Sequence, residues 1–335
     1  MLSNAIEKAQ AGESLSQDEM SEIVDQIMQG QSDTELTARL LTALYKKGET
    51  VEELAGAARA MRNHMNTIRC DHPRAVDTCG TGGSGKGTFN ISTAAAFVAA
   101  ACGTVVAKHG NRKATSNSGS TDVLAELGVA VDKDIASAER CLNEAGLCFC
   151  HAPLFHPSVR HVVPIRMALP HPTIFNLLGP LCNPALAPHQ VLGAGRGETQ
   201  TLISEALAQL GTQHSIVIHG NDGLGEISCQ DQTRVIEVSN TELTETSWSP
   251  NDFGLKISPG DITASSPEQS AKMILDVFAG ESGCQRDIVI LNAAAAVWIT
   301  GNANSLKDAA QRCSEAIDSG AVTAKLEQIR SLTNA

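Results

Sequence analysis

The first 66 residues carry the apolar spacing of amphipathic helices, interrupted by helix-start signals. Leu36, Leu40, Leu41 and Leu44 recur at three- and four-residue steps, which places them on one helix face. Three places fit a capping box, in which a Ser or Thr and a Glu three residues later satisfy each other's backbone amides: Ser16 with Glu19, Ser32 with Glu35, and Thr50 with Glu53. Gly30 and Gly48 are natural helix ends. We therefore predict three helices, which must pack on the rest of the chain or on another subunit.

From about residue 72, short β-prone runs alternate with helical segments, a pattern typical of an α/β domain. The β-prone runs are 104–107, 215–219 and 234–238, and the helical segments are 92–102, 134–145, 200–210, 268–278 and 305–319. Residues 157–169 are predicted as a further helix and 170–188 as a connector. The predicted fold is α/β, with a small N-terminal helical domain and a larger α/β domain in which helices flank a central mixed sheet. We expect the helical domain at 1–70, joined by helices from about 157–185, and the α/β domain at 71–156 and 186–335.

Membrane association is not expected. The two most apolar runs, 94–107 and 288–300, are shorter than the roughly 20 residues of a membrane-spanning helix. The N-terminus has no basic start followed by an apolar stretch, so no signal peptide is predicted. The ten cysteines lack any C-x-x-C motif and are expected to be reduced; Cys148 and Cys150 alternate inside an apolar run that is predicted as a strand. These features favour a cytoplasmic globular protein.

The charge distribution excludes one class of partner and indicates a site. With 25 Lys+Arg against 37 Asp+Glu and only 3% aromatic residues, the chain is not expected to bind nucleic acid. However, no Asp or Glu occurs between Thr78 and Thr121. The same stretch contains Lys86, Lys108, Arg112 and Lys113, so an acidic protein has kept one segment purely cationic.

A glycine loop begins this segment. The sequence CGTGGSGKGTFNIST starts at Cys79, after a short β-prone run at 75–78 and before an Ala-rich helix. Glycines let backbone amides approach an oxyanion closely, and the start of a helix favours negative charge. The arrangement therefore predicts a phosphate-binding loop.

Three other interpretations of the loop are weaker. Gly80, Gly82 and Gly85 fit a dinucleotide fingerprint, but the acid expected about 20 residues later is missing. Residues 80–86 fit the start of a P-loop, but Gly87 stands where a Ser or Thr would bind magnesium. A glycine-rich surface turn without a ligand is the third alternative.

Several longer motifs resemble one enzyme family. KHGNRKATSNSGSTDVLAELGV, FHPSVRHVVPIR, TIFNLLGPLCNP and HGNDGLGEIS follow the glycine loop in this order. Together they resemble the anthranilate phosphoribosyltransferases over about residues 75–228. The resemblance implies transfer of the phosphoribosyl group of phosphoribosyl pyrophosphate to anthranilate, with release of pyrophosphate, in tryptophan biosynthesis. A site rich in Gly, Ser, Thr, Asn and Lys suits this reaction, because its catalysis is mostly positioning and electrostatic stabilisation.

The resemblance also assigns a phosphoribosyl pyrophosphate site to the glycine loop, the start of the next helix and the second motif. Its residues are Gly80, Gly83, Ser84, Thr88, Asn90, Ile91, Ser92, Thr93, Lys108, His109, Gly110, Asn111, Arg112, Lys113, Ala114, Thr115, Ser116 and Ser120. Without the family, Ser92 would be an ordinary N-cap, and Lys108, Arg112 and Lys113 would be solvated charges.

For anthranilate the resemblance implies Gly80, Asn111 and Arg166, since a guanidinium can hold a carboxylate with two parallel hydrogen bonds. His109 is expected to shape this acceptor pocket and not to act as a general base, because an aniline is already neutral at pH 7.

For Mg²⁺ the resemblance implies Ser92 and Glu226. The family usually has an Asp directly before this Glu, where the chain has Gly225. Magnesium can complete its shell with phosphates and water, so we expect one ion to remain and a second to be weakened. Asp222 is a candidate substitute ligand.

Gly225 keeps alternative functions open: a paralogous phosphoribosyltransferase or nucleoside-phosphorylase-like enzyme with another acceptor, or a non-catalytic anion-binding relative. Asn111 and Arg166 favour the anthranilate enzyme. The family likeness further implies a homodimer joined through the helical domain.

Overall fold

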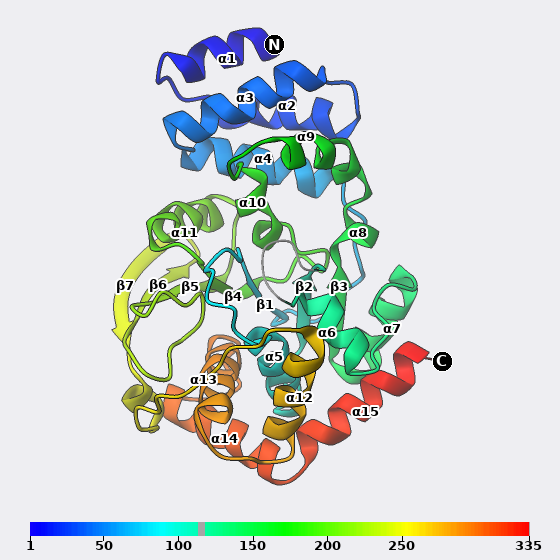
Figure 1. The fold of residues 1–335 in the computed structure, drawn as a ribbon, viewed down its shortest axis with the longest axis vertical. Helices are drawn as coiled ribbons and strands as arrows, with labels where there is room; N and C mark the ends of the chain where they lie inside the picture. Colours follow the sequence, from blue (N-terminus) through cyan, green and yellow to red (C-terminus); the bar gives the residue numbers. More distant parts are fainter. Residues whose placement is uncertain (113–117, 335) are drawn as a thin grey trace.

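The computed structural model describes residues 1–112 and 118–334, with a helical bundle at one end of a larger α/β part (Figure 1). The bundle begins with four helices, one more than the sequence pattern predicted. They are α1 (Leu2–Gln10), α2 (Gln17–Met28), α3 (Thr34–Lys47) and α4 (Val51–Asn63). The unpredicted α1 has no side-chain cap, but it buries Leu2, Ala5, Ile6 and Ala9 on one face.

Two of the three predicted capping boxes are confirmed. Ser16 with Glu19 and Thr50 with Glu53 make both reciprocal bonds. The prediction at Ser32 is wrong, because α3 begins one residue later: the Asp33 carboxylate accepts from the Leu36 amide at 2.8 Å. An aspartate is an equally good N-cap, and the two candidate caps, Ser32 and Asp33, are adjacent in the sequence.

The predicted mixed sheet is confirmed, with seven strands in the order β3-β2-β1-β4-β5-β6-β7. Neighbours from β3 to β5 are parallel, whereas β6 and β7 are antiparallel additions at one edge. The strands are β1 (Val76–Gly80), β2 (Val106–Gly110), β3 (Leu147–His151), β4 (His189–Gly193), β5 (His214–Gly220), β6 (Thr233–Ser239) and β7 (Glu242–Trp248). β4 and β7 were not predicted; β7 is a largely exposed polar edge strand without an apolar pattern.

The remaining helices cover the sheet and connect it to the bundle. They are α5 (Ile91–Ala101), α6 (Ser120–Glu126), α7 (Ile135–Ala145), α8 (Ala152–Phe155), α9 (Val163–Ala168), α10 (Phe175–Leu178), α11 (Gln200–Gln209), α12 (Pro267–Phe278), α13 (Cys284–Ile299), α14 (Leu306–Asp318) and α15 (Ala321–Asn334), with short 3₁₀ turns at Pro157–His161, Gly179–Leu181, Gly197–Thr199 and Pro250–Phe253.

Strand alternation divides the buried residues between two cores on opposite faces of the sheet. Ile216 and Ile218 of β5 join a core with α5, α13, α14 and α15. Val217 between them joins a second core, which runs through α11 into the helical bundle. The bundle is therefore joined to one sheet face through α11, which contacts α4 on one side and β5 and β6 on the other, as Figure 1 shows.

The segment 157–169, predicted as one helix, forms a 3₁₀ turn and the separate helix α9. Pro164 lies in the first turn of α9, where a missing amide hydrogen is tolerated, and this favours a new helix start. Val162, Ile165 and Ile174 are buried in the same core as α1–α4. The exact domain boundaries stay a prediction.

Within the described ranges, no helix is both long and apolar enough to cross a bilayer. All ten cysteines are free thiols.

Candidate active site

The predicted phosphate-binding residues lie at the carboxyl ends of β1 and β2. β1 lies between β2 and β4 in the sheet. The chain continues from β1 to β2 in one direction and from β4 to β5 in the other, so the two connections diverge between β1 and β4. In open α/β sheets, ligands bind at such a switch point, outside the carboxyl ends of the strands. The glycine loop follows β1 here and leads into the N-terminus of α5.

Three loops meet at the switch point through backbone contacts that leave no room for side chains. The Thr81 amide donates to the Gly193 carbonyl at 2.9 Å, and the Gly195 amide donates to the Thr81 hydroxyl at 2.9 Å. A Cβ on Gly193 would lie 1.9 Å from the Gly225 carbonyl oxygen, and a Cβ on Gly195 would lie 2.0 Å from that of Gly82. The glycine loop, the turn after β4 and the loop after β5 are thus fitted to one another.

Lys108 is the buried cation of the site. It lies on β2, and its Nζ donates to the Thr78 carbonyl and, at 3.1 Å, to the Ser92 hydroxyl in the first turn of α5. Burial lowers the Lys108 pKa, which Asp77, Cys79 and Glu226 partly oppose. Lys108 is therefore not a solvated charge, and Ser92 is not the N-cap of α5, since Asn90 takes that place.

Glu226 supplies the acidic side of the site. Burial raises the Glu226 pKa to about 7, while the charge of Lys108 opposes the rise. Asp222 lies on the same loop, but its carboxylate is engaged there: it accepts from the Leu224 amide at 3.2 Å and from the Ser228 hydroxyl at 2.6 Å. A role for Asp222 in metal binding would have to use the remaining lone pairs of this carboxylate and stays a prediction.

The oxygen atoms of Ser92 and Glu226 fit a magnesium ion that is also coordinated by a phosphate ligand. Ser92 and Glu226 offer hard oxygen atoms near the phosphate loop, as magnesium requires. The described residues include no group of three or more His, Cys, Asp or Glu side chains able to enclose a metal. An ion here would depend on substrate oxygens and water for the rest of its shell.

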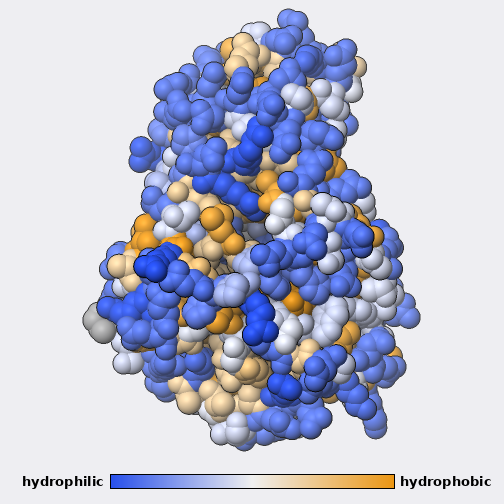
Figure 2. Space-filling view, turned by 180° about the vertical axis from the view of Figure 1, so that it is seen from behind, coloured by the Kyte–Doolittle hydropathy of each residue, from blue (hydrophilic) through white to orange (hydrophobic). Residues whose placement is uncertain are grey.

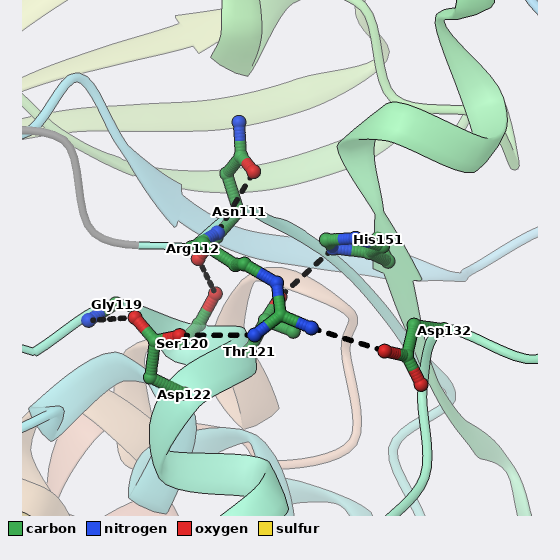
Figure 3. A network of polar contacts seen from close by, with 8 residues as sticks. All are labelled: Asn111, Arg112, Gly119, Ser120, Thr121, Asp122, Asp132 and His151. Atoms are coloured by element: carbon green, nitrogen blue, oxygen red, sulfur yellow. Dashed lines mark hydrogen bonds and ion pairs between the residues drawn. The ribbon is translucent and has the colours of Figure 1, made fainter.

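Arg112 is not a free cation (Figure 3). Its guanidinium pairs with Asp132 at 3.0 Å and with Asp122 at 3.5 Å, on the β3 side of β2. Around it, the Asn111 carbonyl accepts from the Ser120 hydroxyl at 3.2 Å, so both ends of the second phosphate motif are braced. A phosphate that took Arg112 would have to compete with two carboxylates.

Other predicted contacts are restricted by burial or lie outside the described part. The side chains of Ile91 and Thr93 are buried, so they can offer a ligand only backbone groups. Gly80, Gly83, Ser84, Thr88 and Gly110 are at least partly accessible around the loops. Lys113, Ala114, Thr115 and Ser116 lie outside the described residues.

A pair of buried histidines lies beside the end of β2. The rings of His109 and His156 have centroids 4.9 Å apart. His109 Nδ1 donates to the Gly179 carbonyl at 2.9 Å, which leaves Nε2 as the unprotonated nitrogen. Burial lowers the pKa of each ring to about 4. Both imidazoles are therefore neutral near pH 7.

Arg166 on α9 is a half-buried guanidinium that lies 5.8 Å from the centroid of the Phe175 ring. Burial lowers its pKa. Among the described residues it has no ion pair, and no hydrogen bond joins it to Asn111. It thus suits an external carboxylate, while its pairing with Asn111 on one ligand stays a prediction.

Seen from behind, the surface is hollowed where the helical bundle meets the α/β part (Figure 2).

The histidine pair predicts an acid-sensitive fold. Because the folded pKa values lie below the unfolded value of about 6.5, stability is complete above that pH and is lost as the pH falls toward 4. We expect each ring to cost about 2 kcal/mol of unfolding free energy between about pH 7 and pH 5. Urea unfolding at several pH values measures this loss. His156→Phe should remove about 2 kcal/mol of this loss, because burial lowers the pKa of that ring in the folded chain; a slope equal to that of the wild type would contradict the assignment.

Two groups of site residues were missed from sequence. The first is the turn Gly193–Ala194–Gly195, a second strand-to-helix glycine turn whose spacing could have been noticed. The second is the segment around Ile262 and Ser270, which contacts the glycine loop from far along the chain. Nothing local marks this segment as part of a site.

Comparisons with known proteins agree over the whole chain. The model described as "Glycosyl transferase family, a/b domain" matches residues 72–323, and "Glycosyl transferase family, helical bundle domain" matches residues 3–65. The anthranilate phosphoribosyltransferase of Rhodopirellula baltica is 48% identical over 328 residues, covering 98% of this chain and 96% of that protein. That of Clostridium kluyveri is 42% identical over 335 residues, covering 100% of both.

Solved structures show the same agreement. The anthranilate phosphoribosyltransferase of Thermus thermophilus superposes with a TM-score of 0.93 at 38% identity, covering 99% of each chain. The Saccharomyces cerevisiae enzyme in complex with PRPP and Mg superposes with a TM-score of 0.90 at 26% identity, covering 99% of this chain and 98% of that one.

Proposed function

Since this chain belongs to the anthranilate phosphoribosyltransferase family, we propose that it transfers the phosphoribosyl group of phosphoribosyl pyrophosphate to anthranilate. The observation that carries the proposal is the switch-point site at the carboxyl ends of β1 and β2. A glycine loop, a helix N-terminus and buried Lys108 come together there. The alternatives with another acceptor, or without catalysis, are not favoured by the full-length identity to these enzymes.

The reaction breaks the bond between the anomeric carbon and pyrophosphate and joins that carbon to the anthranilate nitrogen, which gives up a proton. Negative charge accumulates on the leaving pyrophosphate. The amides of the glycine loop, the N-terminal end of α5 and the Lys108 ammonium stabilise that charge in a site preorganised by the three-loop contact. Arg166 holds the anthranilate carboxylate, so the amine is oriented toward the sugar.

Magnesium, when bound, neutralises part of the pyrophosphate charge. Ser92 and Glu226 are the residues that would hold it, in keeping with the yeast relative solved with PRPP and Mg. The phosphoribosyl pyrophosphate and anthranilate sites assigned from the family pattern remain proposals residue by residue.

Gly225→Asp is expected to strengthen magnesium use. A Cβ at Gly225 would meet its nearest neighbours at 3.6 Å, an ordinary contact, so the backbone accepts a side chain there. A carboxylate beside Glu226 adds an oxygen ligand and a negative charge, and we expect the half-saturating magnesium concentration to fall about tenfold. Magnesium titration of activity, together with counting of Mn²⁺ bound in the presence of phosphoribosyl pyrophosphate, measures the effect. Gly225→Asn is the neutral control, and identical titrations for both variants would contradict the metal assignment.

An acceptor series tests the function against its alternatives. We expect turnover with phosphoribosyl pyrophosphate and anthranilate, and much weaker turnover with aniline, which lacks the carboxylate for Arg166. Phosphorolysis of a pyrimidine nucleoside, or turnover indifferent to the carboxylate, would instead support one of the alternatives.

A homodimer through the helical bundle is supported by apolar side chains on neighbouring elements of its surface. Tyr45 of α3 is 42% exposed, and Val163 and Met167 of α9 are 38% and 82% exposed. A hollow of about 580 Å³ in the bundle surface is lined by residues of α1 and α3 and by Leu169. Contact with a second copy would remove these apolar side chains from water. Sedimentation equilibrium of the wild-type chain tests the dimer: twice the 35.1 kDa mass of one chain supports it, and the mass of one chain contradicts it. The reduced thiols favour a cytoplasmic location.

A further inference from the structure

A segment between β7 and α12 forms an outer layer on the glycine loop. The Phe89 amide donates to the Ile262 carbonyl at 2.9 Å, and the Ala264 amide donates to the Gly87 carbonyl at 2.8 Å. Thr88 and Thr263 form an antiparallel bridge between these two bonds. The end of the phosphate loop is therefore held in place by residues that lie far away in the sequence.

The same segment leads into α12, which packs on α6 (Figure 1) and carries Ser270. Ser270 is completely buried, and its hydroxyl makes two bonds to one residue of the predicted phosphate site. It accepts from the Asn90 amide at 2.9 Å and donates to the Asn90 Oδ1 at 2.8 Å. One hydroxyl thus fixes both the backbone and the side chain of Asn90.

The Asn90 carboxamide is oriented by this arrangement. Its Oδ1 also accepts from the Ser118 hydroxyl at 2.7 Å, so both lone pairs of that oxygen are used. Among the described residues, its Nδ2 makes one long bond, of 3.4 Å, to the Ser118 carbonyl. Nδ2 is therefore the end of the carboxamide left for a ligand, and phosphoryl oxygens accept hydrogen bonds but do not donate them.

We propose that Ser270 is a positioning residue of the phosphoribosyl pyrophosphate site, which fixes the Asn90 carboxamide with its N–H end toward a phosphoryl oxygen. The inference rests on the proposed function. Ser270 does not touch the reacting atoms and acts through Asn90. Without it, the carboxamide would be held through Ser118 alone, and a rotated carboxamide would present an oxygen that repels the ligand.

Ser270→Ala tests the proposal through a selective loss of affinity. We expect the Kd for phosphoribosyl pyrophosphate, measured by calorimetry, and its KM to rise about fivefold to tenfold. The KM for anthranilate at saturating phosphoribosyl pyrophosphate should stay within about twofold, because Asn90 is not assigned to that substrate. Ser270→Cys, which keeps the size but weakens both bonds, should shift the same Kd by a smaller factor and serves if the alanine variant is unstable.

Ser204→Ala is the matched control. Ser204 is also completely buried, but its hydroxyl donates to the Gln200 carbonyl of its own helix at 2.8 Å, on α11. Its replacement should leave the Kd for phosphoribosyl pyrophosphate unchanged. A double-mutant cycle adds a second criterion: in an Asn90→Ala background, Ser270→Ala should have no further effect on this Kd, since the group it positions is gone.

An unchanged Kd in Ser270→Ala, an equal rise in Ser204→Ala, or additive effects of Ser270→Ala and Asn90→Ala would each overturn the inference. Failure of the function itself gives a different result. A wild-type chain that binds no phosphoribosyl pyrophosphate overturns the proposed function and this inference together. A wild-type chain that binds it, beside a Ser270→Ala chain that binds it equally well, overturns the inference alone.

Discussion

Gly195→Ala is expected to lower kcat/KM for phosphoribosyl pyrophosphate about a hundredfold or more, with little change in the unfolding free energy. The new Cβ would lie 2.0 Å from the Gly82 carbonyl oxygen and 3.0 Å from the Ser84 amide, and both are backbone atoms. No rotamer change relieves such a clash, so the glycine loop must move by more than an ångström. Misplacement on that scale is enough for a hundredfold loss. The fold should survive, because Gly82 and Gly83 are exposed.

Gly225→Ala separates the clash from the general effect of adding a methyl group. Gly225 belongs to the same three-loop contact, but its Cβ would meet neighbours no closer than 3.6 Å. We expect kcat/KM within about threefold of wild type for this control. Equal losses in the two variants would show that the tight packing of Gly195 on the phosphate loop is not what the activity requires.

Lys108→Met should have the largest effect, a fall of about a thousandfold in kcat/KM for phosphoribosyl pyrophosphate. The variant removes the buried ammonium that bonds to the Thr78 carbonyl and Ser92, and with it the fixed positive charge for the leaving pyrophosphate. Stability should be unchanged or higher, because burial already disfavours the charged lysine and lowers its pKa. Steady-state kinetics and urea unfolding of the same preparations measure both quantities.

Lys325→Met is the control for loss of a partly buried lysine. Lys325 on α15 donates to the Ala145 carbonyl at 2.7 Å, and burial lowers its pKa as well. Ala145 precedes the amino end of β3, whereas the phosphate loop follows the carboxyl end of β1, so activity should be retained. If Lys108→Met kept wild-type kcat/KM, Lys108 would be a structural residue only.

Local signals in the sequence were sufficient for much of the fold. Capping pairs and apolar spacing predicted α2–α4, and the glycine loop was correctly placed between a strand and a helix. The failures have physical causes. α1 lacks a cap signal, and the polar strand β7 forms only because β6 offers it a hydrogen-bonding edge.

From the residues alone, the site could be predicted only at the glycine loop and the helix start that follows it, which are neighbours in the chain. The family pattern led to Lys108 and Glu226, but not to their surroundings. Arg112 was expected to contact phosphate, and nothing in the sequence indicated that the fold brings Asp132 to it from the segment after α6. Likewise, Ser270 reaches Asn90 across 180 positions. Such contacts depend on how α12 and the strands pack, and no local periodicity reports them.

The central claim is tested most directly by following anthranilate fluorescence after mixing the purified chain with phosphoribosyl pyrophosphate, magnesium and anthranilate. We predict loss of fluorescence with release of one pyrophosphate per anthranilate consumed, and a product with the mass of N-(5-phosphoribosyl)anthranilate. No turnover at millimolar magnesium, in a chain that is folded and binds phosphoribosyl pyrophosphate, would contradict the account.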